Sequence, residues 1–235
     1  MLLCNPVTVR SRLSSMHYFG DVSGHLRNLL HGDCEVCVFG VVGGDNVSAG
    51  RCAKRAVRRI DDIPEAKWND LTSTQKRRFF DCLADQQDTV EYGYSVITKG
   101  QLHSMDNYHL LYQDVDLTWD LAFTGYVYGE ILFEMGATEE RRALFTFDRV
   151  ASKKQCEKVK THLSDFIPDV KVYYEGSRQS NGIQSADCLA GGIAEDTKAG
   201  TDWMSELETD AVTKGMNSAA LAHLEKSLSD ISAGP

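Results

Sequence analysis

Residues 143–195 decide the fold, and they read ALFTFDRVASKKQCEKVKTHLSDFIPDVKVYYEGSRQSNGIQSADCLAGGIAE. Apolar and aromatic residues gather at 143–147 and again at 170–174, which is typical of buried strands. Each run precedes a stretch with helical spacing, at 152–166 and 182–195. Alternation of strand and helix favours parallel strands joined by right-handed helical crossovers. The stretch therefore predicts an α/β fold.

Upstream of this stretch, the pattern predicts further strands, two surface helices and one buried helix. Segments rich in β-branched and aromatic residues are expected to form strands, the first two as an adjacent antiparallel pair: 17–21, 35–42 and 89–99. Helical spacing predicts two amphipathic helices, at 47–60 and 73–87. It also predicts a long apolar helix at 117–135, which Gly136 ends.

Early strands, a long helix and then strand–helix–strand–helix form the element order of the ribonuclease-H-like fold. We therefore expect a mixed sheet with helices on both faces and an appended C-terminal helix. The chain has 235 residues, of which 42% are hydrophobic, so it is long enough to bury one medium-sized core. We expect an N-terminal arm at 1–15, the ribonuclease-H-like domain at 16–200 and an acidic helical extension at 201–235.

Charge and cysteine content limit the function classes. The net charge is -9 and the pI is near 5.2, so any contact with nucleic acid must be local. Basic clusters at 51–59, 76–78 and 153–160 are candidates for that contact, although each also suits the solvated face of a helix. No secretory or membrane-spanning apolar stretch is evident, so we expect a cytoplasmic protein without a membrane partner.

Seven cysteines are scattered along the chain, and their number is odd. This pattern predicts free thiols in a reducing compartment rather than a disulfide framework. Four of them lie within helical patterns and are expected to fill the core separately: Cys52, Cys82, Cys156 and Cys188.

Three aspartates lie where two strands and a helix would direct them to one point. Asp21 ends the first strand, Asp148 follows the strand at 143–147, and Asp187 lies in the helix at 182–195. In the expected fold the two strands are neighbours, and the helix covers them. Like charges so close together need cations, and hard divalent cations prefer oxygen ligands. The trio therefore predicts a site for Mg²⁺ or Mn²⁺ and metal-dependent cleavage of nucleic acid.

Each aspartate also has a simpler interpretation. Asp21 and Asp148, taken singly, suit the turn that ends a strand. Asp187 lies on a strongly apolar helix, where an unpaired charge is costly, so it requires a partner. Gln184, one turn earlier, is expected either to orient a carboxylate or substrate, or to make an ordinary helix contact. Lys67 and Lys153 are candidates for contact with a substrate phosphate.

Four short motifs resemble one family, which is catalogued as domain of unknown function 3800. Residues 21–24, DVSG, resemble its first-strand signature Asp-Glu-Ser-Gly, and residues 182–187, GIQSAD, resemble its late Gly-Leu-Gln-Leu-Ala-Asp signature. Residues 177–178, SR, are similar to its preceding Ser-Lys, and residues 65–67, EAK, to a Glu-x-Lys element. The resemblance extends from about residue 18 to 192 and implies a ribonuclease-H-like fold and a nuclease role.

The fourth acid of the site has two candidate sources. The resemblance implies Glu65, whereas the fold order points to Glu130 or Glu134 on the long helix. The chain also departs from the family, because Val22 stands where the family has glutamate. This departure favours a second hypothesis, a catalytically inactive protein that keeps the fold for binding or as a scaffold.

Two further hypotheses concern metal and assembly. The motif His31-x-x-Cys34-x-x-Cys37 has ligands for zinc, but a second pair that would complete a closed site is missing, so free thiols are favoured. The long apolar helix and the C-terminal helix offer a face for a homodimer.

Overall fold

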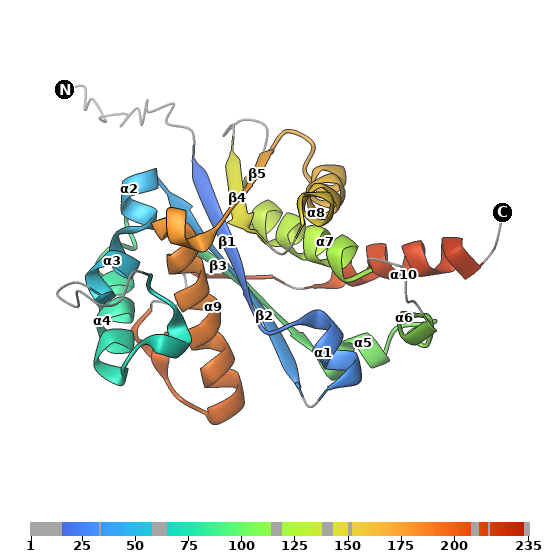
Figure 1. Cartoon of the computed structure of the whole chain (residues 1–235), viewed down its shortest axis with the longest axis horizontal. Coiled ribbons are helices and arrows are strands. Elements are labelled where there is room, and N and C mark those ends of the chain that lie inside the picture. Colours follow the sequence, from blue (N-terminus) through green and yellow to red (C-terminus); the bar gives the residue numbers. More distant parts are fainter. Residues whose placement is uncertain are drawn as a thin grey trace, which may run out of the picture.

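The computed structural model describes residues 16–32, 34–57, 65–113, 119–137, 143–149, 152–207, 212–215 and 217–232. Its centre is a six-stranded mixed sheet with the strand order β5-β4-β1-β2-β3-β6 (Figure 1). The strands are β1 (His17–Ser23), β2 (Val36–Gly44), β3 (Glu91–Thr98), β4 (Leu144–Asp148), β5 (Lys171–Glu175) and β6 (Val212–Lys214). The expected arm at 1–15 lies outside the described residues.

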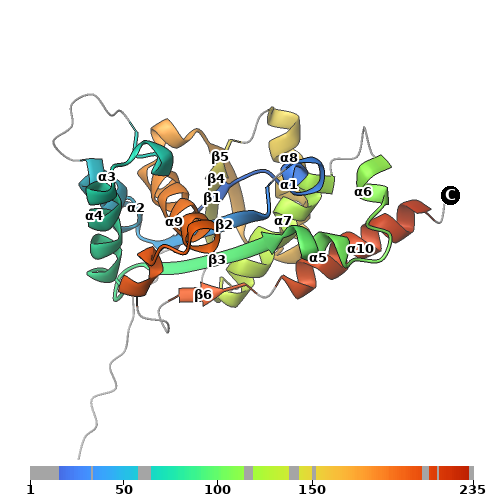
Figure 2. The same ribbon diagram turned by 90° about the horizontal axis from the view of Figure 1, so that it is seen from below.

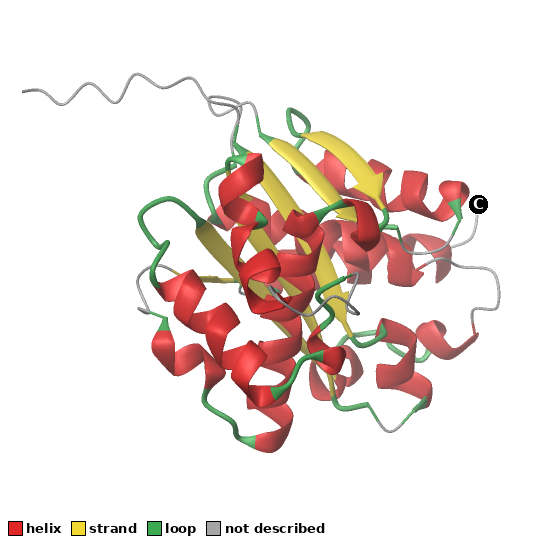
Figure 3. Cartoon of the chain, turned by 60° about the vertical axis from the view of Figure 1, so that its left-hand side comes forward, coloured by secondary structure: helices red, strands yellow, loops and turns green. Residues whose placement is uncertain are grey.

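The strand directions are those of the expected fold. β1, β2 and β3 pair antiparallel in sequence order, as predicted for the first two. β4 pairs parallel with β1, and β5 pairs parallel with β4. Parallel pairing needs long crossovers, and helices supply them here. The chain therefore has a ribonuclease-H-like mixed sheet with helices on both faces (Figure 3).

The helices are α1 (Leu26–His31), α2 (Asn46–Ala49), α3 (Arg51–Val57), α4 (Ser73–Ala84), α5 (Lys99–His103), α6 (Leu110–Gln113), α7 (Trp119–Glu134), α8 (Lys153–Phe166), α9 (Asn181–Ala199) and α10 (Ser218–Ser232). Short 3₁₀ turns lie at η1 (Trp68–Asp70), η3 (Ser177–Gln179) and η4 (Trp203–Glu206). Helix α9, with α3 and α4, covers one face of the sheet, and α7, with α8 and α10, covers the other (Figure 2). Each face has its own apolar core.

The two cores fix the direction of the side chains on β1. Tyr18 belongs to the core on the α7 face, and Phe19 belongs to the core on the α9 face. Successive side chains of a strand point to opposite faces, so Asp21 shares the face of Phe19. On β4, Phe145 and Phe147 lie in the α7 core, which directs Asp148 to the α9 face. Both acids therefore point toward α9.

Glycines allow α9 to lie very close to the sheet. A methyl group on Gly40 of β2 would lie 2.8 Å from the carbonyl oxygen of Ala186 and 3.0 Å from the backbone nitrogen of Ala190. A methyl group on Gly182 would lie 2.3 Å from the ring of Phe19. The first residue of the GIQSAD motif is thus a packing requirement of the fold.

The expected helix at 47–60 is wrong as one continuous element. The chain forms α2 and α3, which are separated at Gly50. A Cβ at Gly50 would lie 2.6 Å from that of Asn181, at the start of α9. The close packing of Gly50 against the start of α9 therefore explains the break between α2 and α3.

The expectation that Cys52 and Cys82 fill the core separately is also wrong. They form a disulfide that joins α3 to α4, with their Cα atoms 5.5 Å apart. The packing of these two helices brings together residues that are 30 positions apart in the sequence. Cys156 and Cys188 are buried and free, as expected.

The C-terminal segment completes the sheet and one core. β6 pairs parallel with β3, and Leu224 and Leu228 of α10 are buried in the core on the α7 face. Helices α7 and α10, which were expected to offer a dimer face, thus pack against each other. Within the described ranges, no helix is both long and apolar enough to cross a membrane.

Candidate active site

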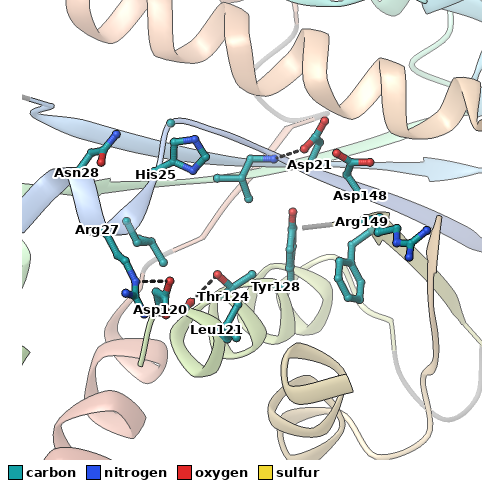
Figure 4. A pocket seen from close by; sticks show the side chains of 14 residues that line it. Asp21, His25, Arg27, Asn28, Asp120, Leu121, Thr124, Tyr128, Asp148 and Arg149 are labelled. Carbon is teal, nitrogen blue, oxygen red and sulfur yellow. Dashed lines mark hydrogen bonds and ion pairs between the residues drawn. The ribbon is translucent and has the colours of Figure 1, made fainter. Parts of the chain in front are cut away.

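Asp21 and Asp148 lie at neighbouring positions on adjacent parallel strands. The preceding residues, Gly20 and Phe147, are partners in the register of β1 and β4. The two carboxylates consequently lie side by side above the sheet (Figure 4). The convergence expected from the strand order is thus present for this pair.

Asp187 approaches the same place from α9. Its Oδ2 accepts a hydrogen bond of 2.9 Å from the backbone N–H of Trp68, in the turn η1. This contact gives the charge on an apolar helix the partner that it requires. The partner is a backbone group, which a side-chain pattern does not reveal.

Glu65 is the fourth acid at this point. It is buried, and its carboxylate accepts hydrogen bonds from Ser177 Oγ at 2.6 Å and from Arg178 Nε at 3.3 Å. Lys67 Nζ lies 3.4 Å from Glu65 Oε1. Two of these contacts join the 65–67 segment to η3, so the EAK and SR motifs meet in space.

A cavity of about 420 Å³, here called the acid cavity, joins these groups. All four acids line it, together with Lys67, Ser177 and Gln184. Ser177 also donates its backbone N–H to Asp148 Oδ1 at 3.0 Å. Ser177 therefore holds Asp148 with its backbone and Glu65 with its hydroxyl. Ser177 belongs to the SR motif, but nothing in the sequence pattern alone predicts this double role.

Gln184 ties two segments of the acid cavity together. Its Oε1 accepts the N–H of Ala66 at 2.9 Å, and its Nε2 donates to the carbonyl oxygen of Ser177 at 3.0 Å. The side chain is buried, and both ends of its amide are used within the chain. Among the residues that the structure describes, Gln184 hydrogen-bonds to no carboxylate directly. It holds the backbone beside Glu65 and at Ser177, so among the expectations for Gln184 a role in orienting carboxylates agrees best with these contacts.

Gln184→Met is expected to lower the free energy of unfolding by about 2–3 kcal/mol, because it leaves two buried backbone groups without partners. Urea unfolding of both proteins measures the change. Gln155→Met is the matched control, since Gln155 makes only an exposed capping contact at the start of α8, worth about 1 kcal/mol or less. Equal losses in the two variants would contradict the clamping role.

The surroundings in the acid cavity favour neutralisation of the negative charges on its carboxylates. Burial, followed by the charges of Asp187 and Asp148, raises the pKa of Asp21 well above its usual value. Burial likewise raises the pKa of Asp148 and of Asp187. Glu65 in turn raises the pKa of Lys67, and the exposed ammonium lies at the edge of the cavity. Negative charge is thus in excess where water is partly excluded.

This donor set suits a hard divalent cation in kind and in charge. Carboxylate oxygens are the ligands that Mg²⁺ and Mn²⁺ prefer, and the raised pKa values of the three aspartates show that their charges are poorly compensated within the chain. In the part of the chain that the structure describes, however, no three His, Cys, Asp or Glu side chains are gathered closely enough to form a ready metal shell. The acids share a cavity without yet forming a coordination sphere.

Other expected site residues lie elsewhere. Lys153 lines a separate depression on α8. Glu130 is buried, and its Oε2 accepts the N–H of Ala220 at 2.8 Å in the first turn of α10. Neither Glu130 nor Glu134 lines the acid cavity, whereas Glu65 does; the exposed Asp70 of η1 lines it as well. Val22 does line it.

The zinc hypothesis finds no geometric support among the described residues. Cys37 is buried in the core on the α7 face, and the ring of His31 packs edge-on against Tyr112. Cys34 Sγ lies 3.0 Å from the carbonyl oxygen of Val36. Around this motif, the residues that the structure describes contain no cluster of three potential zinc ligands.

Comparison with known proteins supports the fold. No protein-family model matches the chain, and no curated protein matches it either. Among solved structures, it is similar to a chain of the PCNA:RNase HII complex from Archaeoglobus fulgidus, with a TM-score of 0.50 and 13% sequence identity. The similarity covers 94% of this chain and 91% of that chain. At this identity the similarity establishes the ribonuclease-H-like fold alone.

Proposed function

We propose that this chain is a divalent-metal-dependent nuclease, or a related phosphoryl-transfer enzyme that acts on nucleic acid. The observation that carries the proposal is the meeting of Asp21, Glu65, Asp148 and Asp187, from distant segments, in one cavity that the exposed Asp70 also lines. Their mutual repulsion and burial are costly to the folded protein unless the charges serve a ligand. A cation that bridges these acids to a phosphate is the ligand that fits best.

The comparisons agree with this proposal at the level of the fold. The similar structure is that of a complex that contains RNase HII, which is named as a ribonuclease. The four motifs that resemble domain of unknown function 3800 include Asp21, Glu65 and Asp187, which all line the acid cavity. We therefore also infer membership of that family.

Each residue has a part in the proposed chemistry. Asp21, Asp148 and Asp187 would hold Mg²⁺ or Mn²⁺, which, when bound, neutralises charge on the phosphate and lowers the pKa of water. The N–H groups of Trp68 and Ser177 orient two of these carboxylates. Lys67 is exposed at the edge of the cavity, where its ammonium would meet a phosphate oxygen.

A catalytically inactive binding or scaffold protein is the second candidate. Val22 favours it, since a residue without metal-binding side-chain atoms stands beside Asp21 where the resembling family has glutamate. The loose spacing of the acids among the described residues favours it as well. Such a protein would bind nucleic acid without cleaving it.

Metal binding is expected to stabilise the protein through the acid cavity. A Mn²⁺ concentration of 100 times the Kd should add about 2.7 kcal/mol and raise the Tm by roughly 5–10 °C. Differential scanning fluorimetry over a Mn²⁺ series measures this rise. Asp187→Asn should remove most of it, whereas Asp81→Asn, which alters an exposed acid on α4, should keep it. An unchanged rise in Asp187→Asn would contradict the metal site.

Cleavage itself separates the two candidates. We expect the protein with Mn²⁺ to cut at least one of four labelled oligonucleotides: single-stranded DNA, duplex DNA, single-stranded RNA or an RNA–DNA hybrid. Chelation by EDTA should stop the reaction, and excess Mn²⁺ should restore it. Mn²⁺ binding with no cleavage of any of the four would favour the binding protein instead.

A further inference from the structure

A second cavity lies beside the acid cavity, between α1 and α7 (Figure 4). Its volume is about 360 Å³, within the usual range for a small-molecule site. Asp21 and Asp148 line both cavities, so a ligand that fills one would touch a ligand in the other. The walls of the second cavity combine the apolar side chains of Leu26, Leu121 and Phe147 with polar and charged ones.

Most of the polar groups around the second cavity already have partners. Arg27 of α1 and Asp120 of α7 form a two-point ion pair, with Nε–Oδ2 at 2.8 Å and Nη2–Oδ1 at 3.2 Å. Thr124 donates its hydroxyl to the carbonyl oxygen of Asp120 at 2.7 Å. The ion pair joins the two helices on either side of the cavity.

Among the described residues, the side chains of His25, Asn28 and Arg149 also lack such a partner, but they are exposed, whereas Tyr128 is buried. It is only 2% exposed, and its ring packs against Phe39 and Phe145 at centroid distances of 5.3 and 5.0 Å. A methyl group on Gly20 would lie 2.8 Å from this ring, so the absent side chain of β1 makes room for it. The ring is thus held on several sides, and the position of its hydroxyl is fixed.

The hydroxyl of Tyr128 points into the cavity toward Asp21 and Asp148 (Figure 4). It makes no hydrogen bond to any residue that the structure describes. The oxygen of this hydroxyl borders the cavity rather than being sealed in the core, so a ligand in the cavity can supply its acceptor. Burial and the two nearby aspartates raise the pKa of Tyr128, so the group remains a donor at neutral pH.

We propose that the second cavity binds the nucleoside unit next to the phosphate held at the acid cavity, and that the Tyr128 hydroxyl donates a hydrogen bond to that unit. This inference rests on the proposed function. The apolar side chains of the wall suit the faces of a sugar and a base, its polar groups suit their hydrogen-bonding edges, and the size suits one unit. The carboxylates at the shared edge disfavour a second phosphate, which leaves the uncharged part of the substrate for this side.

Nucleotide binding tests the subsite without requiring cleavage. The probes are adenosine and thymidine 5′-monophosphates, with inorganic phosphate for comparison, titrated calorimetrically in the presence of Mn²⁺. The parent protein should bind at least one nucleotide about 10-fold or more tightly than phosphate. Tyr128→Phe should weaken that nucleotide about 5- to 10-fold, the effect of one hydrogen bond. Binding of both nucleotides no tighter than that of phosphate would overturn the proposal.

Two further variants separate occupancy of the cavity from general damage. Thr124→Phe places a ring in the cavity and should reduce nucleotide affinity to that of phosphate. Tyr126→Phe is the matched control on the same helix, because its hydroxyl contacts His162 and Ser227 away from the cavity. Tyr126→Phe should bind nucleotides as the parent does. Parental affinity in Thr124→Phe would also overturn the proposal.

The outcomes for the subsite and for the enzyme are distinguishable. Nucleotide affinity that depends on Tyr128, together with no cleavage of any oligonucleotide, would support the subsite and reject the nuclease. Cleavage that depends on Asp21, together with nucleotide affinity indifferent to both cavity variants, would support the nuclease and reject the subsite.

Discussion

Asp21→Asn is expected to reduce Mn²⁺-dependent cleavage on the order of 1,000-fold or more, while it raises the Tm of the metal-free protein. The activity falls because the substitution removes a charged oxygen from the centre of the proposed metal site. The stability rises because asparagine has the same shape without the charge. Its side-chain oxygen still accepts the N–H of Val22, which lies 2.7 Å from Asp21 Oδ1.

The gain in stability has a defined pH dependence. The pKa of Asp21 in the folded protein lies well above 3.8, its ordinary value, so folding favours the protonated acid. The cost of the charge is absent below about pH 3.8 and grows as the pH rises through the folded-state pKa. The Tm difference between Asp21→Asn and the parent should therefore be positive at pH 7 and shrink toward zero near pH 4.

Thermal melts between pH 4 and 8 with EDTA measure this difference, and cleavage assays with Mn²⁺ measure the activity. Asp81→Asn, the exposed control, should retain the activity and the melting curve of the parent. A fully active Asp21→Asn would reject the enzymatic proposal. A lower Tm at pH 7 in the metal-free variant would show that the charge of Asp21 is compensated within the fold.

Gly40→Ala is expected to cost about 3 kcal/mol and to lower the Tm by roughly 6–12 °C. The new methyl group would lie 2.8 Å from the carbonyl oxygen of Ala186, and a backbone atom cannot rotate away as a side-chain tip can. Helix α9 must therefore move off the sheet. Asp187 follows Ala186 directly, and a shift of about 1 Å at a catalytic group lowers the rate roughly 100-fold.

Gly176→Ala is the matched control for this prediction. Gly176 immediately precedes Ser177 at the acid cavity, but a methyl group there would have no atom within 4 Å. Its backbone conformation, φ -77° and ψ 139°, is open to any residue. We expect a change within about 0.5 kcal/mol and near-parental activity. A Gly40→Ala protein that melts and cleaves like the parent would show that α9 tolerates displacement.

Local patterns in the sequence predicted much of the fold. A strand repeats every two residues and a helix every 3.6, so the apolar spacing predicted the helices at 117–135 and 152–166 to within two residues of α7 and α8. The spacing did not predict the break at Gly50, because the cause lies in the docking of Asn181 about 130 positions away.

The candidate site likewise contains residues that the sequence order predicted and residues that only the packed structure identifies. Asp21 and Asp148 lie on one parallel pair of strands, and the strand order predicted their meeting. The expectation that Asp21 ends its strand is wrong, because β1 continues to Ser23, whereas Asp148 does end β4. Fold order pointed to Glu130 or Glu134 as the fourth acid, and only the family resemblance placed Glu65 ahead of them. Only the packed structure gives Glu130 a partner in the N–H of Ala220 and brings Glu65 to the acid cavity.

Residue patterns were enough to predict the alternation of elements, the two strands that carry acids and the need of Asp187 for a partner. The tertiary structure alone decided which partner that is, the pairing of Cys52 with Cys82, and the free hydroxyl of Tyr128 beside the acids. The difference arises from the separation in sequence between the residues that interact. Periodicity records neighbours a few residues apart on one element, whereas these contacts join segments whose approach depends on how the whole core packs.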